Sequence, residues 1–241
     1  NIIATFRDIT NFRKADEAKT TFISIVSHEL KTPVALIKGY VCTLNRKDVK
    51  WDSAFVDESL KIIEEEADHL NELIENLLDA TRLQTGKFAI QKTDISIPLM
   101  ARRLVDRFST QTKKHTFTIN FSDDFPSVMA DDTRIEQVIS NLISNAIKYS
   151  EKGEICISGE ARSDKVIICV SDEGQGIAPQ DFPFIFDRFY RSPDTARKTK
   201  GTGLGLYLTK QIVEAHKGRI WVDTERDKGA RICFSLPRTE E

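Results

Sequence analysis

The chain has 241 residues, of which 40% are hydrophobic and 30% are charged, and its formal net charge is −2. This length is enough for two domains with separate cores, and the near-neutral charge argues against nucleic acid or an anionic membrane as the main partner. No apolar run approaches the ~20 residues of a membrane span. The chain opens on Asn1 without a signal peptide, which suits an excised piece of a longer protein.

The cysteines show no C-x-x-C spacing, and each has apolar or strand-like neighbours. We interpret them as reduced core thiols of a cytosolic protein. The histidines are scattered, so no metal site built from Cys and His is predicted. The residues concerned are Cys42, Cys156, Cys169, Cys233, His28, His69, His115 and His216.

The first predicted elements are a short strand at residues 2–6 and a long amphipathic helix that ends near Asn45. A polar stretch, residues 13–20, leads into this helix. Pro33 lacks a backbone donor and should kink or loosen the turn after His28. At ~100° per residue, one face of the helix collects its apolar side chains: Phe22, Val26, Leu30, Pro33, Ile37, Tyr40, Val41 and Leu44.

His28 sits roughly 200° from the centre of that apolar face, which places it towards water. An exposed imidazole with a pKa near ~6.5 is largely neutral at pH 7 and offers a ring nitrogen as a nucleophile. Glu29 follows directly and could hold the other ring N–H or take its proton. The alternative for this histidine alone is ordinary helix surface.

A second helix carries apolar residues in alternating steps of four and three, the pattern of a coiled-coil or four-helix seam. Two such helices form a hairpin that cannot cover its own apolar stripe, so we expect two hairpins to pair into a dimeric four-helix bundle. Gly86 should end the helix. The seam residues are Val56, Leu60, Ile63, Ala67, Leu70, Ile74 and Leu77.

Beyond Gly86 strands and helices alternate, which predicts three helices on one face of a mixed sheet, an α/β sandwich. Asp131 or Asp132 should cap the second helix of this part. The predicted strands are 87–95, 115–121, 154–160, 165–171, 219–224 and 229–236, and the predicted helices are 98–110, 131–149 and 203–217.

Asn141 and Asn145 lie one turn apart on the helix predicted over 131–149, with Lys148 close to their stripe. Two stacked amides beside a lysine can hold a hydrated Mg²⁺ through neutral oxygens while the lysine meets phosphate. A solvated Asn/Lys face is the alternative for this segment alone.

Asp172 follows an apolar strand, and Gly174 and Gly176 come at alternate positions after it. Glycines there allow a tight turn and close approach of the backbone to a ligand. Asp172 could accept a hydrogen bond from an exocyclic amine. A plain hairpin turn is the alternative.

Gly201, Gly203 and Gly205 open the last helix and leave backbone N–H groups free to face phosphates. Their spacing is not that of a dinucleotide fold, and no Walker lysine follows. The polar run 192–200 before them is interpreted as a lid that carries Arg197, Lys198 and Lys200. Alternatively, its charges belong to a solvated loop, and the aromatic residues of segment 186–191 are core anchors.

In their order and spacing these segments resemble the sensor histidine kinases of two-component signalling, whose ATP-binding fold is shared with gyrase, Hsp90 and MutL-type proteins. Ser27–Pro33 is similar to the phospho-acceptor box and Asn141–Tyr149 to the asparagine box. Asp172–Ile177 and Gly201–Leu206 are similar to the two glycine boxes, and Phe186–Arg191 to the phenylalanine box. The resemblance covers nearly all of residues 11–237.

The resemblance implies an α+β chain in which a dimeric helical-hairpin domain, residues 11–86, precedes an α/β sandwich ATP-binding domain, residues 87–241. Residues 1–10 weakly resemble the end of a PAS sensor domain. A linker near Thr85–Lys87 should act as the hinge on which the ATP-binding domain swings onto the bundle.

The resemblance also implies roles for single residues. His28 would be the phospho-acceptor, Glu29 its general base, and Thr32 the residue that orients water when the partner is dephosphorylated. Asn145 would bind Mg²⁺ with help from Asn141. The full ATP-binding set is Asn141, Asn145, Lys148, Tyr149, Asp172, Gly174, Gly176, Ile177, Arg188, Arg191, Lys200, Gly201, Thr202, Gly203, Leu204, Gly205 and Leu206.

We therefore expect Mg·ATP-dependent autophosphorylation of His28 and transfer to an aspartate of a response-regulator receiver domain. The expected partners are a second copy of the chain and that receiver domain, without nucleic acid. Membrane contact is expected only if the full-length protein has further segments, and this part should be cytoplasmic. The alternatives are a protein that chiefly acts as a phosphatase, a scaffolding pseudokinase, and an ATPase of the gyrase or Hsp90 type.

Overall fold

The computed structural model describes residues 10–84, 89–192, 201–224 and 228–238. The chain forms two compact units, residues 1–78 with 200–202 and residues 79–199 with 203–241. The predicted strand at residues 2–6, the possible end of a PAS domain at 1–10 and the helix stop at Gly86 lie outside the described residues.

The first unit is built from two long helices, α1 (Thr10–Leu44) and α2 (Ser53–Gln84). The last turns of α2, from Asp79 on, belong to the second unit. The polar stretch 13–20 is part of α1 and not a lead-in to it, because its Lys, Glu, Arg and Ala residues are good helix formers. Pro33 is buried, and α1 continues through it.

The connection between α1 and α2 is closed by aromatic and polar contacts. The indole N–H of Trp51 donates to the carbonyl of Thr43 at 3.1 Å, and its ring stacks on Phe55 with 4.5 Å between centroids. Asp52 accepts a hydrogen bond from the amide of Phe55 at 2.7 Å, which caps α2. These contacts define where the hairpin turns.

The predicted second helix is confirmed, and part of its apolar seam is open to solvent in the single chain. Leu60 is 53% exposed and Ile74 is 42% exposed, while Val34 and Val41 of α1 are 50% and 49% exposed. One hairpin therefore leaves apolar side chains of both helices uncovered.

The second unit contains a five-stranded sheet in the order β2-β4-β5-β7-β6. β2 runs parallel to β4, and the other neighbours are antiparallel, so the mixed sheet of the prediction is confirmed. The strands are β2 (His115–Asn120), β4 (Gly153–Ala161), β5 (Lys165–Ser171), β6 (Arg219–Val222) and β7 (Arg231–Pro237).

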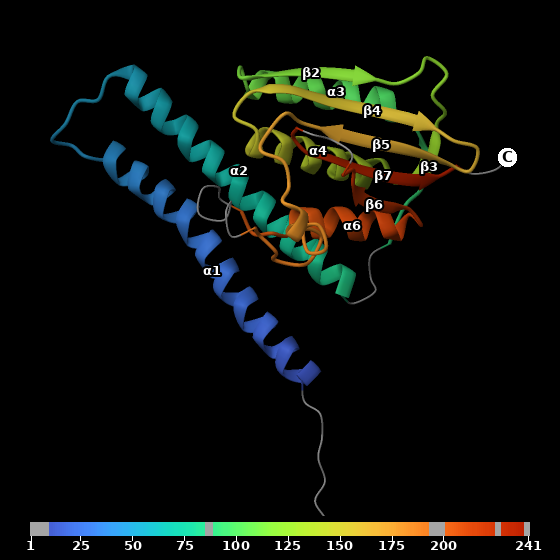
Figure 1. Ribbon diagram of the computed structural model, residues 1–241. Helices are drawn as coiled ribbons and strands as arrows, with labels where there is room; N and C mark the ends of the chain where they lie inside the picture. The colour runs from blue at the N-terminus through green and yellow to red at the C-terminus, as the bar shows by residue number, and fades with distance from the viewer. Residues whose placement is uncertain (1–9, 85–88, 193–200, 225–227, 239–241) are drawn as a thin grey trace, which may run out of the picture. The chain divides into compact units, whose positions relative to one another are not determined.

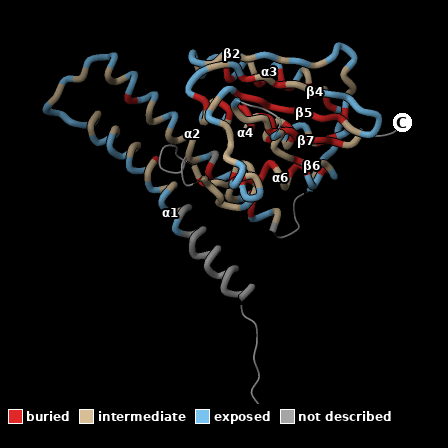
Figure 2. Tube along the Cα trace, viewed as in Figure 1, coloured by how far each residue is buried: buried red, intermediate tan, exposed pale blue. Residues whose placement is uncertain are grey.

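Three helices pack on one face of this sheet: α3 (Ile97–Gln111), α4 (Asp132–Tyr149) and α6 (Gly205–Ala215) (Figure 1). Asp131 caps α4 by accepting from the amide of Arg134 at 3.1 Å. The buried core joins the inward side chains of the strands to the apolar faces of the helices. In Figure 2 the buried positions accordingly gather in the sheet and its helices.

Two short elements differ from the sequence prediction. Of the strand expected over 87–95, the described residues 89–95 form only β1 (Thr93–Ile95), which pairs with an unpredicted strand, β3 (Val128–Ala130), in a separate two-stranded sheet. A 3-10 turn at Pro179–Asp181 was also not predicted. Three residues are too few to show a period in the sequence.

The interpretation of all four cysteines as reduced core thiols is wrong. Cys169 and Cys233 face each other in register on β5 and β7 and form a disulfide. Cys42 is exposed and Cys156 is only partly buried. The two bonded residues are 64 positions apart, so only the strand pairing reveals their proximity.

His216 is buried where α6 ends, and its protonation should couple stability to pH. Its Nε2 accepts from the amide of Asp131 at 3.0 Å, so its Nδ1–H donates to the carbonyl of Ile212 at 2.8 Å. Burial lowers the pKa of His216, and the nearby Lys92 acts in the same direction, against the opposing effects of the Ile212 carbonyl and Asp131.

We predict a stability loss at mildly acidic pH from this histidine. Its folded pKa lies below the unfolded value of about 6.5, so between the two values the unfolded chain binds more protons. The contribution of His216 to the free energy of unfolding is therefore complete above its pKa in the unfolded chain. It is lost as the pH falls from that value through the pKa of His216 in the folded chain. Melting temperatures of wild type and His216→Gln from pH 8 to 5 check this: the variant should lose part of the slope, and equal slopes would contradict it.

Candidate functional site

The candidate phospho-acceptor His28 lies on the surface of α1. Its side chain is 81% exposed, and its Nδ1 lies 3.7 Å from Oε1 of Glu29, whose side chain is only 13% exposed. A partly buried carboxylate beside one ring nitrogen favours a proton on that nitrogen. Nε2 is then the nitrogen available to an electrophile.

Thr32 lies one turn after His28 on the same helix. Its hydroxyl donates to the carbonyl of His28 at 3.3 Å, which ties the side chain to the backbone of the histidine. The first unit therefore presents an imidazole, a carboxylate and a hydroxyl within one and a half turns of α1.

The second unit contains a cavity of about 510 Å³ between α4, the end of β5, the start of β7 and the chain that follows β5. This volume falls in the usual range for small-molecule sites. Seven predicted ATP-binding residues line it: Asn145, Tyr149, Asp172, Gly176, Ile177, Arg191 and Leu206.

Asp172 is buried at the end of β5 and held by the backbone on two sides. Its Oδ1 accepts from the amide of Gly174 at 2.8 Å and from the amide of Ala230 at 3.2 Å. A side chain on Gly174 would lie 2.5 Å from the carbonyl of Tyr149 and 2.9 Å from the Asp172 carboxylate, so glycine is required for this clamp. The carboxylate is thereby fixed at the wall of the cavity.

The remaining walls are largely apolar. A slot with aliphatic sides and a fixed carboxylate at the end of β5 suits a planar heterocycle that carries a hydrogen-bond donor, such as the adenine amine. The aliphatic wall residues outside the predicted set are Leu142, Ala146, Val170, Ala178, Pro179, Ile185, Ala230 and Ile232, and the polar ones are Gln175, Asp181, Tyr190 and Ser192.

Asn141 and Asn145 lie on the same side of α4 but do different things. Asn145 lines the cavity. The Asn141 amide donates to the hydroxyl of Thr209 at 2.7 Å, and the carbonyl oxygen of the same side chain would clash with any side chain on Gly205. Asn141 therefore joins α4 to the start of α6 and is not on the cavity wall.

Lys148 lines a second, open cavity of about 1000 Å³, which shares Tyr149 and Gln175 with the first. Its Nζ lies 5.5 Å from the centroid of the Tyr149 ring. The lysine is thus placed beside the nucleotide-sized cavity and not inside it.

The described glycines of the last box differ in role. Gly203 has a φ of 70°, and a side chain there would lie 2.7 Å from the Tyr190 carbonyl oxygen, so it lets the chain pass closely over the phenylalanine box. Leu204 is buried against Leu208, and Gly201 and Thr202 group with the first unit. Lys200 lies outside the described residues.

The cavity wall also contains a polar pair that lies outside the predicted ATP-binding set. The hydroxyl of Tyr190 donates to buried Asp181 at 2.7 Å. This hydrogen bond, together with burial, raises the pKa of Tyr190. Tyr190 lies in the predicted aromatic segment, whereas Asp181 stands in no motif.

The two arginines of the predicted ATP-binding set lie differently. Arg191 lines the cavity, while the guanidinium of Arg188 lies 4.7 Å from the Phe189 ring centroid.

Two known protein families match parts of the chain. Residues 130–240 match the histidine kinase-, DNA gyrase B- and HSP90-like ATPases, and residues 18–86 match the His Kinase A phospho-acceptor domain. The second unit is thus of the gyrase B and HSP90 class of ATP-binding folds.

Individual relatives narrow this class. Sensor histidine kinase WalK of Bacillus subtilis (strain 168) is 34% identical over 246 residues, which cover 100% of this chain and 40% of WalK. The structure of Acinetobacter baumannii histidine kinase AdeS is 25% identical with a TM-score of 0.68, over 88% of this chain and 98% of that one. Histidine kinase ThkA, solved in complex with response regulator protein TrrA, is 26% identical with a TM-score of 0.66, over 98% of this chain and 69% of ThkA.

The chain belongs to the sensor histidine kinases of two-component signalling. It spans about 40% of the length of the curated relatives it matches. Among the described residues, no helix is both long enough and apolar enough to span a membrane.

Proposed function

We propose that this chain is a protein histidine kinase that phosphorylates His28 from ATP and passes the phosphoryl group to an aspartate of a receiver domain. Nε2 of His28 would attack the γ-phosphorus, a P–N bond would form, and the bond from that phosphorus to the bridging oxygen would break to release ADP. The observation that carries this proposal is the exposed imidazole with Glu29 at 3.7 Å from Nδ1.

Glu29 would hold the Nδ1 proton and stabilise the positive charge that grows on the ring during attack. Its low exposure strengthens this interaction, since water screens a partly buried carboxylate less than an exposed one. The P–N bond is labile, which suits onward transfer to a carboxylate. Positioning and charge neutralisation are the main demands of phosphoryl transfer.

ATP would occupy the cavity with its adenine amine on Asp172 and its ring between the aliphatic walls. The side-chain oxygen of Asn145 fits Mg²⁺, which prefers oxygen ligands and keeps several waters. The ion would neutralise phosphate charge, with Lys148 and Arg191 on the flanks of the site. Because Asn141 is bonded to Thr209, we assign it a positioning role and not metal binding.

A second copy of the chain would cover the open apolar positions of the hairpin. Exposed aliphatic residues at heptad spacing on two helices are typical of half of a four-helix bundle. Homodimerisation through the first unit is therefore part of the proposal.

The receiver domain would dock on the α1 face that presents His28 and Thr32. ThkA was solved with a response regulator, and this chain covers 69% of ThkA. The hinge predicted near Thr85–Lys87 lies outside the described residues, and a cytoplasmic location for this part stays a prediction.

Phosphatase activity towards the phosphorylated regulator is a second candidate, favoured by the position of Thr32. Its hydroxyl is one turn from His28 and bonded to the histidine's carbonyl. We predict that Thr32→Ala slows dephosphorylation of the receiver by about tenfold or more, since it removes the group that orients water. Thr32→Ser should retain most of the activity. Release of phosphate from purified phospho-receiver measures this, and an unchanged rate in Thr32→Ala would rule out this role.

Incubation of the chain with Mg²⁺ and γ-labelled ATP tests the main proposal. The expected result is a protein-bound label that is lost in acid and retained in base, as the P–N bond requires. ATP binding without label would rule out autokinase activity of this chain and favour the phosphatase or the scaffold.

A further inference from the structure

Asp79 is a buried carboxylate near the end of α2, and its side chain is only 3% exposed. A charge in such a place is costly unless it is paired and hydrogen-bonded. None of the chemistry described above uses it. Its partners therefore point to a separate role.

Two of these partners come from the first turns of α4. Oδ2 of Asp79 lies 2.5 Å from Nη1 of Arg134 and 3.1 Å from Nε2 of Gln137. The same Nη1 donates to the Gln137 side-chain oxygen at 2.9 Å, so the three side chains form a closed triad. Arg82, one turn further along α2, lies 3.7 Å from Oδ1.

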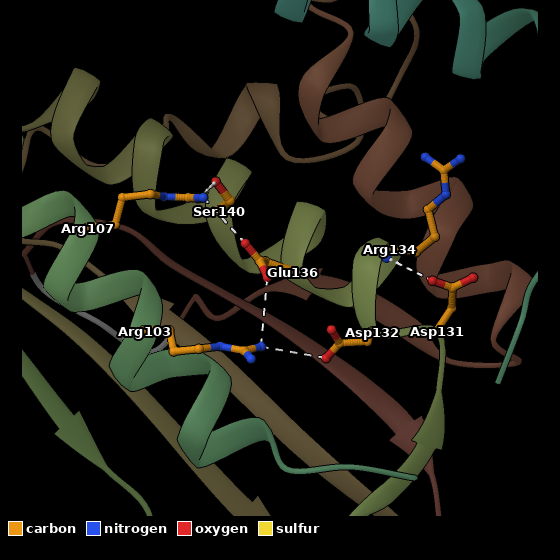
Figure 3. A network of polar contacts seen from close by, with 7 residues as sticks. All are labelled: Arg103, Arg107, Asp131, Asp132, Arg134, Glu136 and Ser140. Carbon is orange, nitrogen blue, oxygen red and sulfur yellow. Dashed lines mark hydrogen bonds and ion pairs between the residues drawn. The ribbon is translucent and has the colours of Figure 1, made fainter. Parts of the chain in front are cut away.

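The triad is distinct from the surface ion pairs on α4. Glu136 pairs with Arg103 at 3.8 Å and with Arg107 at 3.4 Å on the α3 side. Figure 3 shows that the Arg134 side chain extends away from this network. The triad contains a buried carboxylate and a half-buried arginine, whereas both arginines of the network are exposed, which provides a matched comparison on one helix.

Apolar contacts hold the same turns of α2. Ala80 is fully buried against Leu204 and Leu208, and Leu83 packs on the same cluster with Phe189 and Tyr207. Residues 79–83, which we call the anchored segment, thus have a polar and an apolar attachment, and they group with the second unit.

The helix that receives Asp79 also carries the nucleotide. From Gln137 the polar side of α4 continues to Asn141, which holds α6, and to Asn145 in the cavity wall. Asn145 lies eight positions after Gln137 along α4, a rise of about 12 Å at 1.5 Å per residue. A shift of the anchored segment would therefore be transmitted to the cavity through a rigid helix.

We infer that Asp79 is a positioning residue that makes the anchored segment part of the ATP-binding body during phosphoryl transfer. This inference rests on the proposed kinase function. According to this inference, the two units hinge at a point of α2 before Asp79. That point lies one to two helical turns before the hinge predicted at Thr85–Lys87. The ATP-binding domain then moves together with the end of α2.

Hydrogen exchange of the whole chain tests the anchor without any catalysis. Amides of residues 80–83 should be as protected as those of α4, both without nucleotide and during turnover with Mg·ATP. In Asp79→Asn they should exchange about tenfold faster, while Glu136→Gln should match wild type. Release of residues 80–83 when Mg·ATP is added, or equal protection in Asp79→Asn, would overturn the inference.

Kinetics test the positioning. At saturating Mg·ATP, Asp79→Asn should slow His28 phosphorylation by about tenfold, because the ATP-binding domain is then misplaced relative to the histidine. The affinity for a non-hydrolysable ATP analogue should change less than about twofold. Equal losses of rate and affinity would indicate general unfolding and overturn it.

Gln137→Ala serves as a second variant if Asp79→Asn does not fold, because it leaves the ion pair intact. It should shift exchange and rate in the same direction by a smaller factor, and wild-type behaviour would count against the triad. Absence of label in wild type with normal protection of residues 80–83 would instead refute the kinase proposal alone.

Discussion

Replacement of His28 by glutamine is expected to abolish autophosphorylation completely while nucleotide binding is retained. The side chain is 81% exposed, and among the described residues it has a polar contact with Glu29 at 3.7 Å, so its loss should leave the fold intact. Glutamine has no comparable nucleophile, because its amide nitrogen is not basic. Incorporation of γ-labelled phosphate, followed beside analogue binding, measures both effects.

His69→Gln is the matched control, since it also removes a histidine from a long helix of the hairpin. This variant should be labelled as wild type is. Label that persists in His28→Gln would mean that another residue is the acceptor.

Replacement of Asp172 by asparagine should weaken ATP binding by about 30-fold or more, the worth of a hydrogen bond to a charged group. The amide oxygen of asparagine can still accept from Gly174 and Ala230, so the clamp is preserved. Its NH₂ group would then replace the second carboxylate oxygen and face the adenine amine, donor against donor. Titration with a fluorescent ATP analogue checks this.

Asp223→Asn controls for the loss of one negative charge, because Asp223 lies outside the cavity and pairs with Arg231 at 3.6 Å. The affinity of the Asp223→Asn variant for the ATP analogue should stay within about twofold of wild type. If Asp172→Asn binds ATP normally, adenine is read by other groups and the assignment of this carboxylate is wrong.

Long periodic segments of the fold could be predicted from the sequence. Helices α3, α4 and α6 each bury one apolar face, and strands β4, β5 and β7 are long enough to show their pattern. Strand β1 was predicted too long and strand β3 was not predicted, because each has three residues and is stabilised by pairing with the other. The Cys169–Cys233 bond was missed for a related reason, since only the pairing of β5 with β7 makes them neighbours.

The site was predictable where a motif is local in sequence. Asp172 follows a strand and precedes two glycines, so its place at a ligand could be inferred. Ala230 completes the same clamp from 58 residues away, and nothing in its own segment shows it. Asn141 marks the limit of spacing arguments. It shares a helix side with Asn145, yet its amide is bonded to Thr209.

The Asp172 clamp changes what the presence of a motif residue says about a chain of this family. Because Oδ1 ties the end of β5 to Ala230 at the start of β7, selection on folding alone would retain aspartate or asparagine at position 172 in a protein that no longer used ATP. His28 contributes no such tie and would drift once catalysis was lost. Among relatives that have lost kinase activity, an intact glycine box would therefore indicate only that the fold is kept. The exposed histidine is the residue whose presence would indicate that phosphoryl transfer is still under selection.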